Sequence, residues 1–92
     1  MPLEVELVAA DHKVWGGEAS MVVARTLDGD LGVLPGHTPV LAVLAPCVIT
    51  IKATDGGDVL AHCDGGFLSV EHDRVMIVSD RADLGSAPTA DR

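Results

Sequence analysis

The chain has 92 residues and a formal net charge of -8, from 14 acidic against 6 basic side chains. Such a field repels nucleic-acid phosphates and anionic lipids, which argues against a nucleic-acid partner and against direct membrane insertion. The length supports one domain, and because 48% of the residues are hydrophobic but only one is Trp and one Phe, the core must consist mainly of Val, Leu, Ile and Ala, which favours strands.

The N-terminal third predicts strands joined by glycine turns. Residues 3–8 alternate apolar and acidic side chains, which is the period of a strand with one buried face. Gly16-Gly17 is predicted as the turn before a strand over residues 19–25, and Leu27-Asp28-Gly29 as a second turn. The N-terminus lacks a basic segment followed by an apolar stretch, so no signal peptide is expected and the chain is predicted to be soluble and cytoplasmic.

Residues 29–39 read Gly-Asp-Leu-Gly-Val-Leu-Pro-Gly-His-Thr-Pro, a run with three glycines and two prolines that no regular strand or helix requires. Glycine permits positive φ and proline fixes φ without an N–H to satisfy. The run therefore predicts a shaped loop between two strands. It presents the carboxylate of Asp30 and the imidazole of His37 on a rigid surface, which is typical of a contact site.

The remaining two thirds of the chain predict a series of short strands. Pro46 cannot donate a ladder hydrogen bond and is predicted as a strand boundary, and Gly65-Gly66 is predicted as a second break. Residues 55–58 and His72-Asp73 are predicted as hairpin connections. The strands between these breaks are residues 40–44, 47–53, 59–64, 67–71 and 75–79.

About eight to ten strands at this spacing predict an all-β fold, a single antiparallel β-sandwich of two sheets. We expect the domain to span residues 1–80. Residues 81–92 are small and polar and include Gly85 and Pro88, so a short, flexible and disordered C-terminal tail is expected there.

The sequence lacks the patterns that catalysis requires. None of the four histidines has the paired spacing of a metal site. Neither Ser20 nor Ser69 lies in the glycine-flanked turn of a catalytic nucleophile. No helix or Gly-Lys-Ser/Thr sequence follows any glycine pair, so these pairs are not phosphate loops. We therefore expect no enzyme activity, no metal and no cofactor.

Two cysteines and two aromatic residues are predicted to be structural. Cys47 and Cys63 lack a Cys-x-x-Cys spacing and read as buried, reduced thiols, although a disulfide stays open if their strands lie side by side. Trp15 and Phe67 are predicted to anchor the core rather than to bind a partner.

One string is specific enough to indicate a family. Gly32-Val33-Leu34-Pro35-Gly36-His37-Thr38-Pro39, followed by the apolar residues 40–44 and later by Gly65-Gly66-Phe67, resembles the epsilon subunit of the rotary F-type ATP synthase. The resemblance covers nearly the whole chain, because residues 3–8, 14–17 and 74–78 also fall where that family has strands and a turn.

The resemblance implies a sandwich of two five-stranded sheets and a non-catalytic subunit of the central stalk. Such a subunit links the gamma subunit to the membrane c-ring and couples proton flow to ATP synthesis. By resemblance, Asp30 lies toward arginine-bearing loops of the c-ring, and His37, Thr38, Pro39 and Ala42 lie toward gamma. Leu31 belongs by the same resemblance to the interface with gamma and the c-ring. It also implies a peripheral position on the cytoplasmic face of the bacterial plasma membrane, within the F1 sector, and no homo-oligomer.

The chain departs from that family at its C-terminus, where epsilon subunits commonly continue into two helices that carry inhibition and, in some members, ATP binding. Neither property is expected of this chain. A free-standing β-sandwich adaptor that binds another basic protein is the alternative function. At residue level, Asp30 can equally be a solvated turn carboxylate, and His37 an imidazole that holds its own loop.

Overall fold

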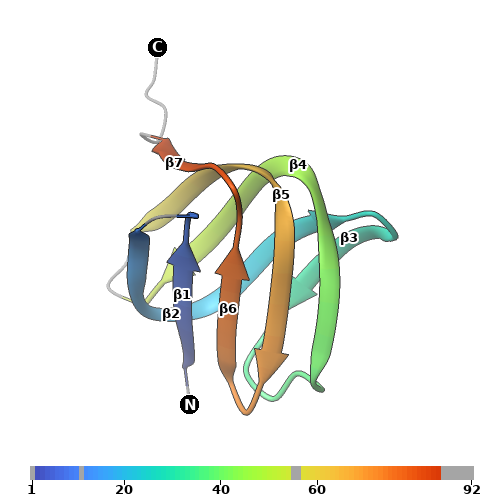
Figure 1. Cartoon of the computed structure of the whole chain (residues 1–92). Coiled ribbons are helices and arrows are strands. Elements are labelled where there is room, and N and C mark those ends of the chain that lie inside the picture. The colour runs from blue at the N-terminus through green and yellow to red at the C-terminus, as the bar shows by residue number, and fades with distance from the viewer. Residues whose placement is uncertain (1, 11, 55–56, 86–92) are drawn as a thin grey trace.

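The computed structural model describes residues 2–10, 12–54 and 57–85, and within these ranges it contains strands but no helix (Figure 1). The strands, in chain order, are β1 (Leu3–Val8), β2 (Lys13–Thr26), β3 (Gly29–Val33), β4 (Val40–Ala53), β5 (Asp58–Glu71), β6 (Arg74–Val78) and β7 (Ala82–Gly85).

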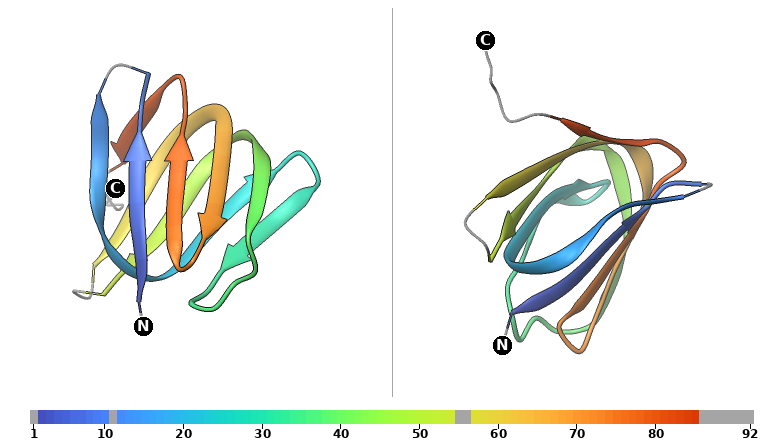
Figure 2. Two further views of the ribbon diagram at one scale, coloured as in Figure 1. Left: turned by 60° about the horizontal axis from the view of Figure 1, so that its bottom comes forward. Right: turned by 90° about the vertical axis from the view of Figure 1, so that its left-hand side faces the viewer.

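The strands form a two-layered sandwich because β2, β4 and β5, each 14 residues long, cross from one layer to the other (Figure 2). The first layer contains the N-terminal half of β2, then β1, β6, the C-terminal half of β5 and the N-terminal half of β4. The second layer contains β3 and the other halves of β2, β4 and β5, ending at β7. The predicted β-sandwich is confirmed. The described residues form seven strands rather than the predicted eight to ten short ones, because three long strands contribute to both layers.

One pairing is not antiparallel. β1 runs parallel to β6, with Glu4 opposite Arg74 and Val8 opposite Val78, whereas the other pairings are antiparallel. Parallel neighbours need a long connection, and here that connection is most of the chain.

The predicted strand breaks at Pro46 and Gly65-Gly66 are wrong, because β4 and β5 continue through them as the corner of the sandwich. Their register is unbroken, from Leu44 opposite Gly66 to Pro46 opposite Asp64. The buried face nevertheless changes from even-numbered residues such as Leu44 to odd-numbered ones such as Ile49. Gly65 and Gly66 have φ values of 91° and 118°, and these conformations allow the corner.

Pro46 is tolerated within β4 because of where it lies in the ladder. The Asp64 N–H donates to the Arg81 carbonyl oxygen at 3.1 Å, so the backbone polar groups of Asp64 point toward β7 and away from Pro46. Pro46 therefore occupies a non-hydrogen-bonded position opposite Asp64, where a missing N–H removes no bond to β5.

The predicted turn at Gly16-Gly17 is also wrong, since both glycines lie within β2 opposite Glu6 and Val5. The chain reverses earlier, where the Ala9 N–H donates to the His12 carbonyl oxygen at 2.8 Å. The glycines make room for side chains instead: a Cβ on Gly17 would lie 3.0 Å from the ring of Trp15.

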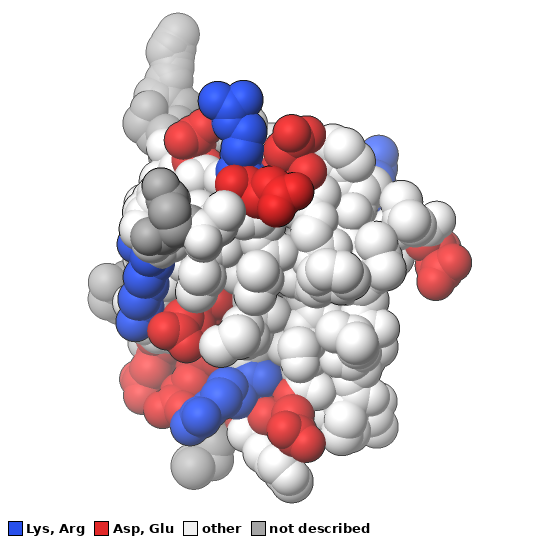
Figure 3. Space-filling model, viewed as in Figure 1, with Lys and Arg blue, Asp and Glu red and all other residues white. Residues whose placement is uncertain are grey.

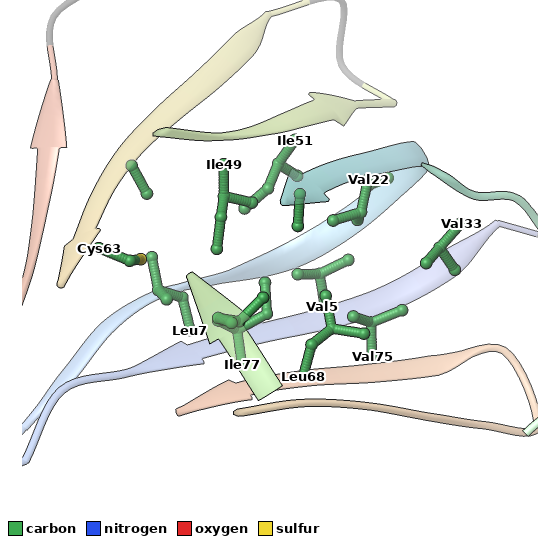
Figure 4. Packing of buried hydrophobic residues seen from close by; sticks show 14 of the residues in the cluster. Val5, Leu7, Val22, Val33, Ile49, Ile51, Cys63, Leu68, Val75 and Ile77 are labelled. Carbon is green, nitrogen blue, oxygen red and sulfur yellow. The ribbon is translucent and has the colours of Figure 1, made fainter. Parts of the chain in front are cut away.

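The core lies between the layers and is aliphatic, as the composition predicts. Figure 4 shows inward-pointing side chains from both layers, including Leu7, Val22, Ile49, Leu68 and Ile77, all fully buried. Trp15 packs against this cluster, partly buried, in agreement with its predicted structural role.

The last described strand extends the sandwich beyond residue 80. β7 pairs with β5, with Cys63 opposite Ala82 and Leu60 opposite Gly85, and Ala82 is buried. Residues 82–85 therefore belong to the sandwich rather than to the tail that the polar composition predicts from residue 81. The rest of that predicted tail, residues 86–92, lies outside the described residues.

Candidate partner-binding surface

The central part of the predicted loop is a β-turn that fits its sequence. The His37 N–H donates to the Leu34 carbonyl oxygen at 3.0 Å, and Gly36 has a φ of 87°. Proline at the second position and a glycine with positive φ at the third define a type II turn. The loop is shorter than predicted, because residues 29–33 form β3 and only residues 34–39 connect it to β4.

A second turn holds this loop in place. The Gly36 N–H donates to Asp73 Oδ1 at 2.6 Å, and Asp73 lies in the two-residue hairpin turn between β5 and β6. His72 and Asp73 have φ values of 51° and 60°, the left-handed conformation that such hairpin turns require. The His37 Nδ1 lies 2.6 Å from the Thr38 carbonyl oxygen, so the imidazole does contact its own loop.

Asp30 lies on β3 rather than in the loop, and it already has an ionic partner. Arg25, directly opposite on β2, places its Nε 3.0 Å from Asp30 Oδ1. Sequence reasoning missed this partner, although Arg25 and Asp30 lie at equal distances from the Leu27-Asp28 part of the predicted turn. Both side chains are about two-thirds exposed, at 66% and 71%, so the pair is worth at most about 1 kcal/mol and is open to a competing cation.

The structure divides the six predicted site residues between two places. Asp30, Leu31 and Ala42 line one open groove of about 470 Å³ between the β2–β3 hairpin and β4. His37 and Thr38 lie in the loop at the opposite end of β3, and Pro39 leads from it into β4 (Figure 1). Asp30 and His37 therefore do not form one site.

The most prominent surface feature is an apolar face on the outside of the first layer. Three exposed positions lie in one row across β4, β5 and β6, with Val43 opposite Phe67 and Phe67 opposite Val78. Leu41 and Met76 belong to the next row, separated by Ser69. Figure 3 shows this part of the surface without charged side chains, in contrast to the β1 side. We call Leu41, Val43, Phe67, Met76 and Val78 the apolar face.

Phe67 was predicted as a core anchor, and this prediction is wrong, because 53% of the side chain is exposed. Its neighbours Leu68 and Val70 are the buried residues of this half of β5. The alternation was available in the sequence, since strand neighbours on either side of Leu68 must point outward. The apolar face could not be predicted from β4 and β6, because these strands carry apolar residues on both sides there and so lack the alternation that distinguishes an outer face.

Two kinds of feature are absent from the part of the chain that the structure describes: a cluster of metal ligands and a candidate membrane-spanning helix. Among residues 2–10, 12–54 and 57–85, no group of three or more His, Cys, Asp or Glu side chains could hold a metal ion. Over the same ranges, no helix is long and apolar enough to cross a membrane.

Residues 2–85 match the family described as the β-sandwich domain of the ATP synthase delta/epsilon chain. The ATP synthase epsilon chain of Micrococcus luteus is 51% identical over 88 residues, covering 96% of this chain and 97% of that protein. The epsilon chain of Streptomyces griseus is 48% identical over 90 residues and is covered to 73% of its length.

Solved structures agree. A chain in the mitochondrial ATP synthase of Euglena gracilis, solved as an OSCP, F1 and c-ring assembly, superimposes with a TM-score of 0.84 at 25% identity. The match covers 90% of this chain and 53% of that one. A chain of the Tetrahymena thermophila central stalk and c-ring shares the fold with a TM-score of 0.75 at 22% identity. The chain therefore belongs to the epsilon chains of ATP synthase, and residues 2–85 are the β-sandwich domain of that family.

Proposed function

We propose that the protein joins the gamma subunit of an ATP synthase to the c-ring, with the apolar face and residues 38–42 toward gamma and the Asp30 end of β3 toward the ring. As an epsilon chain it is a non-catalytic rotor subunit, which transmits rotation and performs no chemistry. The observation that supports the gamma side of this proposal best is the apolar face.

Large apolar side chains that share one surface indicate a protein interface, because a partner that covers them removes their apolar area from water, which is favourable. Leu41 is 72% exposed, and Val43 and Phe67 are about half exposed. These residues continue directly into the Thr38–Pro39 segment at the start of β4. A partner that covers this face would therefore also lie next to Thr38 and Pro39, whereas the side chain of Ala42 points to the opposite side of β4 from Leu41 and Val43.

The exposed Arg25–Asp30 pair favours the ring side of the proposal. An arginine on a ring loop can replace Arg25 as the partner of Asp30, and the bidentate geometry of an arginine and a carboxylate makes such an exchange specific. Leu31, which lines the same groove as Asp30, supplies adjacent apolar contact area.

Binding to gamma and the ring would place the protein at the membrane without inserting it. We propose a peripheral position in the F1 sector, on the cytoplasmic face of a bacterial plasma membrane. The bacterial origin of the similar epsilon chains and the F1 and c-ring content of the Euglena assembly support this location.

The experiment that tests the proposal is reconstitution of the chain with purified gamma subunit and c-ring, followed by size-exclusion chromatography. We expect one complex that contains all three components. If the folded chain binds neither gamma nor the ring, the rotor proposal fails and the adaptor alternative becomes the better description.

A further inference from the structure

Cys47 and Cys63 lie directly opposite each other in the ladder between β4 and β5. Directly opposed residues project from the same side of a sheet. For these two it is the core side, because Ile49 and Ala61, two positions further along each strand, are fully buried. Both thiols are free in the structure.

The ladder also gives the spacing of the pair. The Ala53 N–H donates to the Gly57 carbonyl oxygen, so Ala53 and Gly57 are a hydrogen-bonded pair of the ladder. Hydrogen-bonded and non-hydrogen-bonded pairs alternate along an antiparallel ladder. Cys47 and Cys63, three such alternations further along, are therefore also a hydrogen-bonded pair. Such pairs have Cα atoms about 5.5 Å apart. Disulfides span Cα separations of about 4.4 to 6.8 Å, most often close to this value.

Solvent reaches the pair from one side. Cys47 is half-buried and Cys63 is 5% exposed, and the Cys47 Sγ lies 3.7 Å from the Arg25 carbonyl oxygen on β2. The partial exposure of Cys47 gives a small oxidant access to this residue, whereas Cys63 is almost fully covered.

The two thiols differ in reactivity. Burial, and secondarily the neighbouring Cys47, raises the pKa of Cys63 to about 11, against the opposing effect of the Ser79 hydroxyl. Cys63 is therefore a protonated thiol at neutral pH and is a poor first nucleophile. The more exposed Cys47 is the sulfur that an oxidant meets first.

We propose that Cys47 and Cys63 form a redox modification site, in which peroxide oxidises the pair to a cross-strand disulfide at the corner of the sandwich. The Cys47 thiolate attacks one oxygen of hydrogen peroxide, the O–O bond breaks, and hydroxide leaves and is protonated to water. Cys63 then attacks the resulting Cys47 sulfenic acid: the S–S bond forms, the S–O bond breaks, and the Cys63 proton leaves with the oxygen as a second water. Peroxide is reduced to two waters, and a dithiol reductant reverses the oxidation.

The test is treatment of the purified chain with hydrogen peroxide, followed by alkylation with N-ethylmaleimide and intact-mass and peptide analysis. We expect the mass to fall by two hydrogen atoms, both thiols to escape alkylation, and one peptide pair to be linked through residues 47 and 63. Dithiothreitol should restore both thiols. A product that gains oxygen while Cys63 stays alkylatable, or a disulfide-linked dimer, would overturn the proposal.

Two variants test the order of attack. With Cys63→Ser, the sulfenic acid on Cys47 should accumulate and react with dimedone. With Cys47→Ser, Cys63 should react with peroxide at least about tenfold more slowly. Equal rates for the two variants would contradict the assigned roles. Circular dichroism checks that each variant folds, and Cys63→Ala replaces Cys63→Ser if the buried hydroxyl prevents folding.

Discussion

Gly66 illustrates how the corner between the layers constrains single residues. Its φ is 118°, and an added Cβ would collide with the carbonyl oxygen of Val78 and lie 2.8 Å from the Cα of Ser79. Both obstacles are backbone atoms at the C-terminal end of β6 and directly after it, and they cannot move without shifting that end of the strand. Only glycine fits this position, because it has no Cβ and tolerates positive φ.

Substitution of Gly66 by Ala should therefore destabilise the fold by roughly 2 to 4 kcal/mol. Gly32→Ala is the matched control, because no atom lies within 4 Å of its added Cβ and its φ is not positive. Urea unfolding followed by circular dichroism measures both. Equal effects of the two substitutions would show that the corner does not depend on Gly66.

Substitution of Asp30 should weaken binding to the c-ring without a comparable loss of stability. Because its pair with Arg25 is largely exposed, Asp30→Asn should change the free energy of unfolding by less than about 1 kcal/mol. The same substitution should weaken c-ring association, measured by co-sedimentation with ring-containing liposomes in the presence of gamma. Asp58→Asn, which removes the comparably exposed pair with Lys52, is the control. Unchanged ring association with Asp30→Asn would remove this carboxylate from the proposed interface.

At the scale of elements, the turn at residues 34–37 depends on the hairpin at His72-Asp73. The bond from the Gly36 N–H to Asp73 joins two connections that are far apart in sequence, at the same end of the first layer. His37 adds a contact to the Thr38 carbonyl oxygen within the loop. The loop is thus held at two points, which keeps residues 38–42 in a fixed position for a partner.

His37→Ala tests whether this loop acts in binding beyond its own structure. We expect the affinity for gamma, measured by isothermal titration calorimetry, to fall by about tenfold, while the half-buried position in a loop limits the loss of stability to about 1 kcal/mol. His62→Ala, on the second layer, controls for loss of an imidazole outside the proposed interface. If binding falls only as far as stability does, His37 merely holds the loop.

Features that depend only on neighbouring residues were predicted well from the sequence. Features that depend on pairing between distant segments were predicted poorly. The turns at Leu27-Asp28-Gly29 and His72-Asp73 are determined by their own residues, and both were predicted. Pro46 and Gly65-Gly66 carry the same kind of local signal, yet they serve a corner that exists only because β4 and β5 pair along their whole length. Likewise β7 forms through pairing with β5, which its small and polar sequence does not indicate.

At the scale of the whole molecule, the two layers differ in their outer surfaces. The first layer carries the apolar face, beside a charged side over β1 (Figure 3). The predicted contact residues followed from the family resemblance, whereas the apolar face required the structure, because only the register places Val43, Phe67 and Val78 in one row. A site assembled from three strands is not visible in any one of them.

The most direct test of the account is the affinity of the gamma subunit for Phe67→Glu, measured by isothermal titration calorimetry against the wild type. A carboxylate at the centre of the apolar face should weaken binding by at least about thirtyfold, because a charge would be buried at the interface. Val48→Glu is the matched control, since Val48 is 45% exposed on the outside of the second layer. Retained binding by Val48→Glu and lost binding by Phe67→Glu, with both variants folded, is the predicted result. Wild-type affinity of Phe67→Glu would contradict the assignment of the apolar face to gamma.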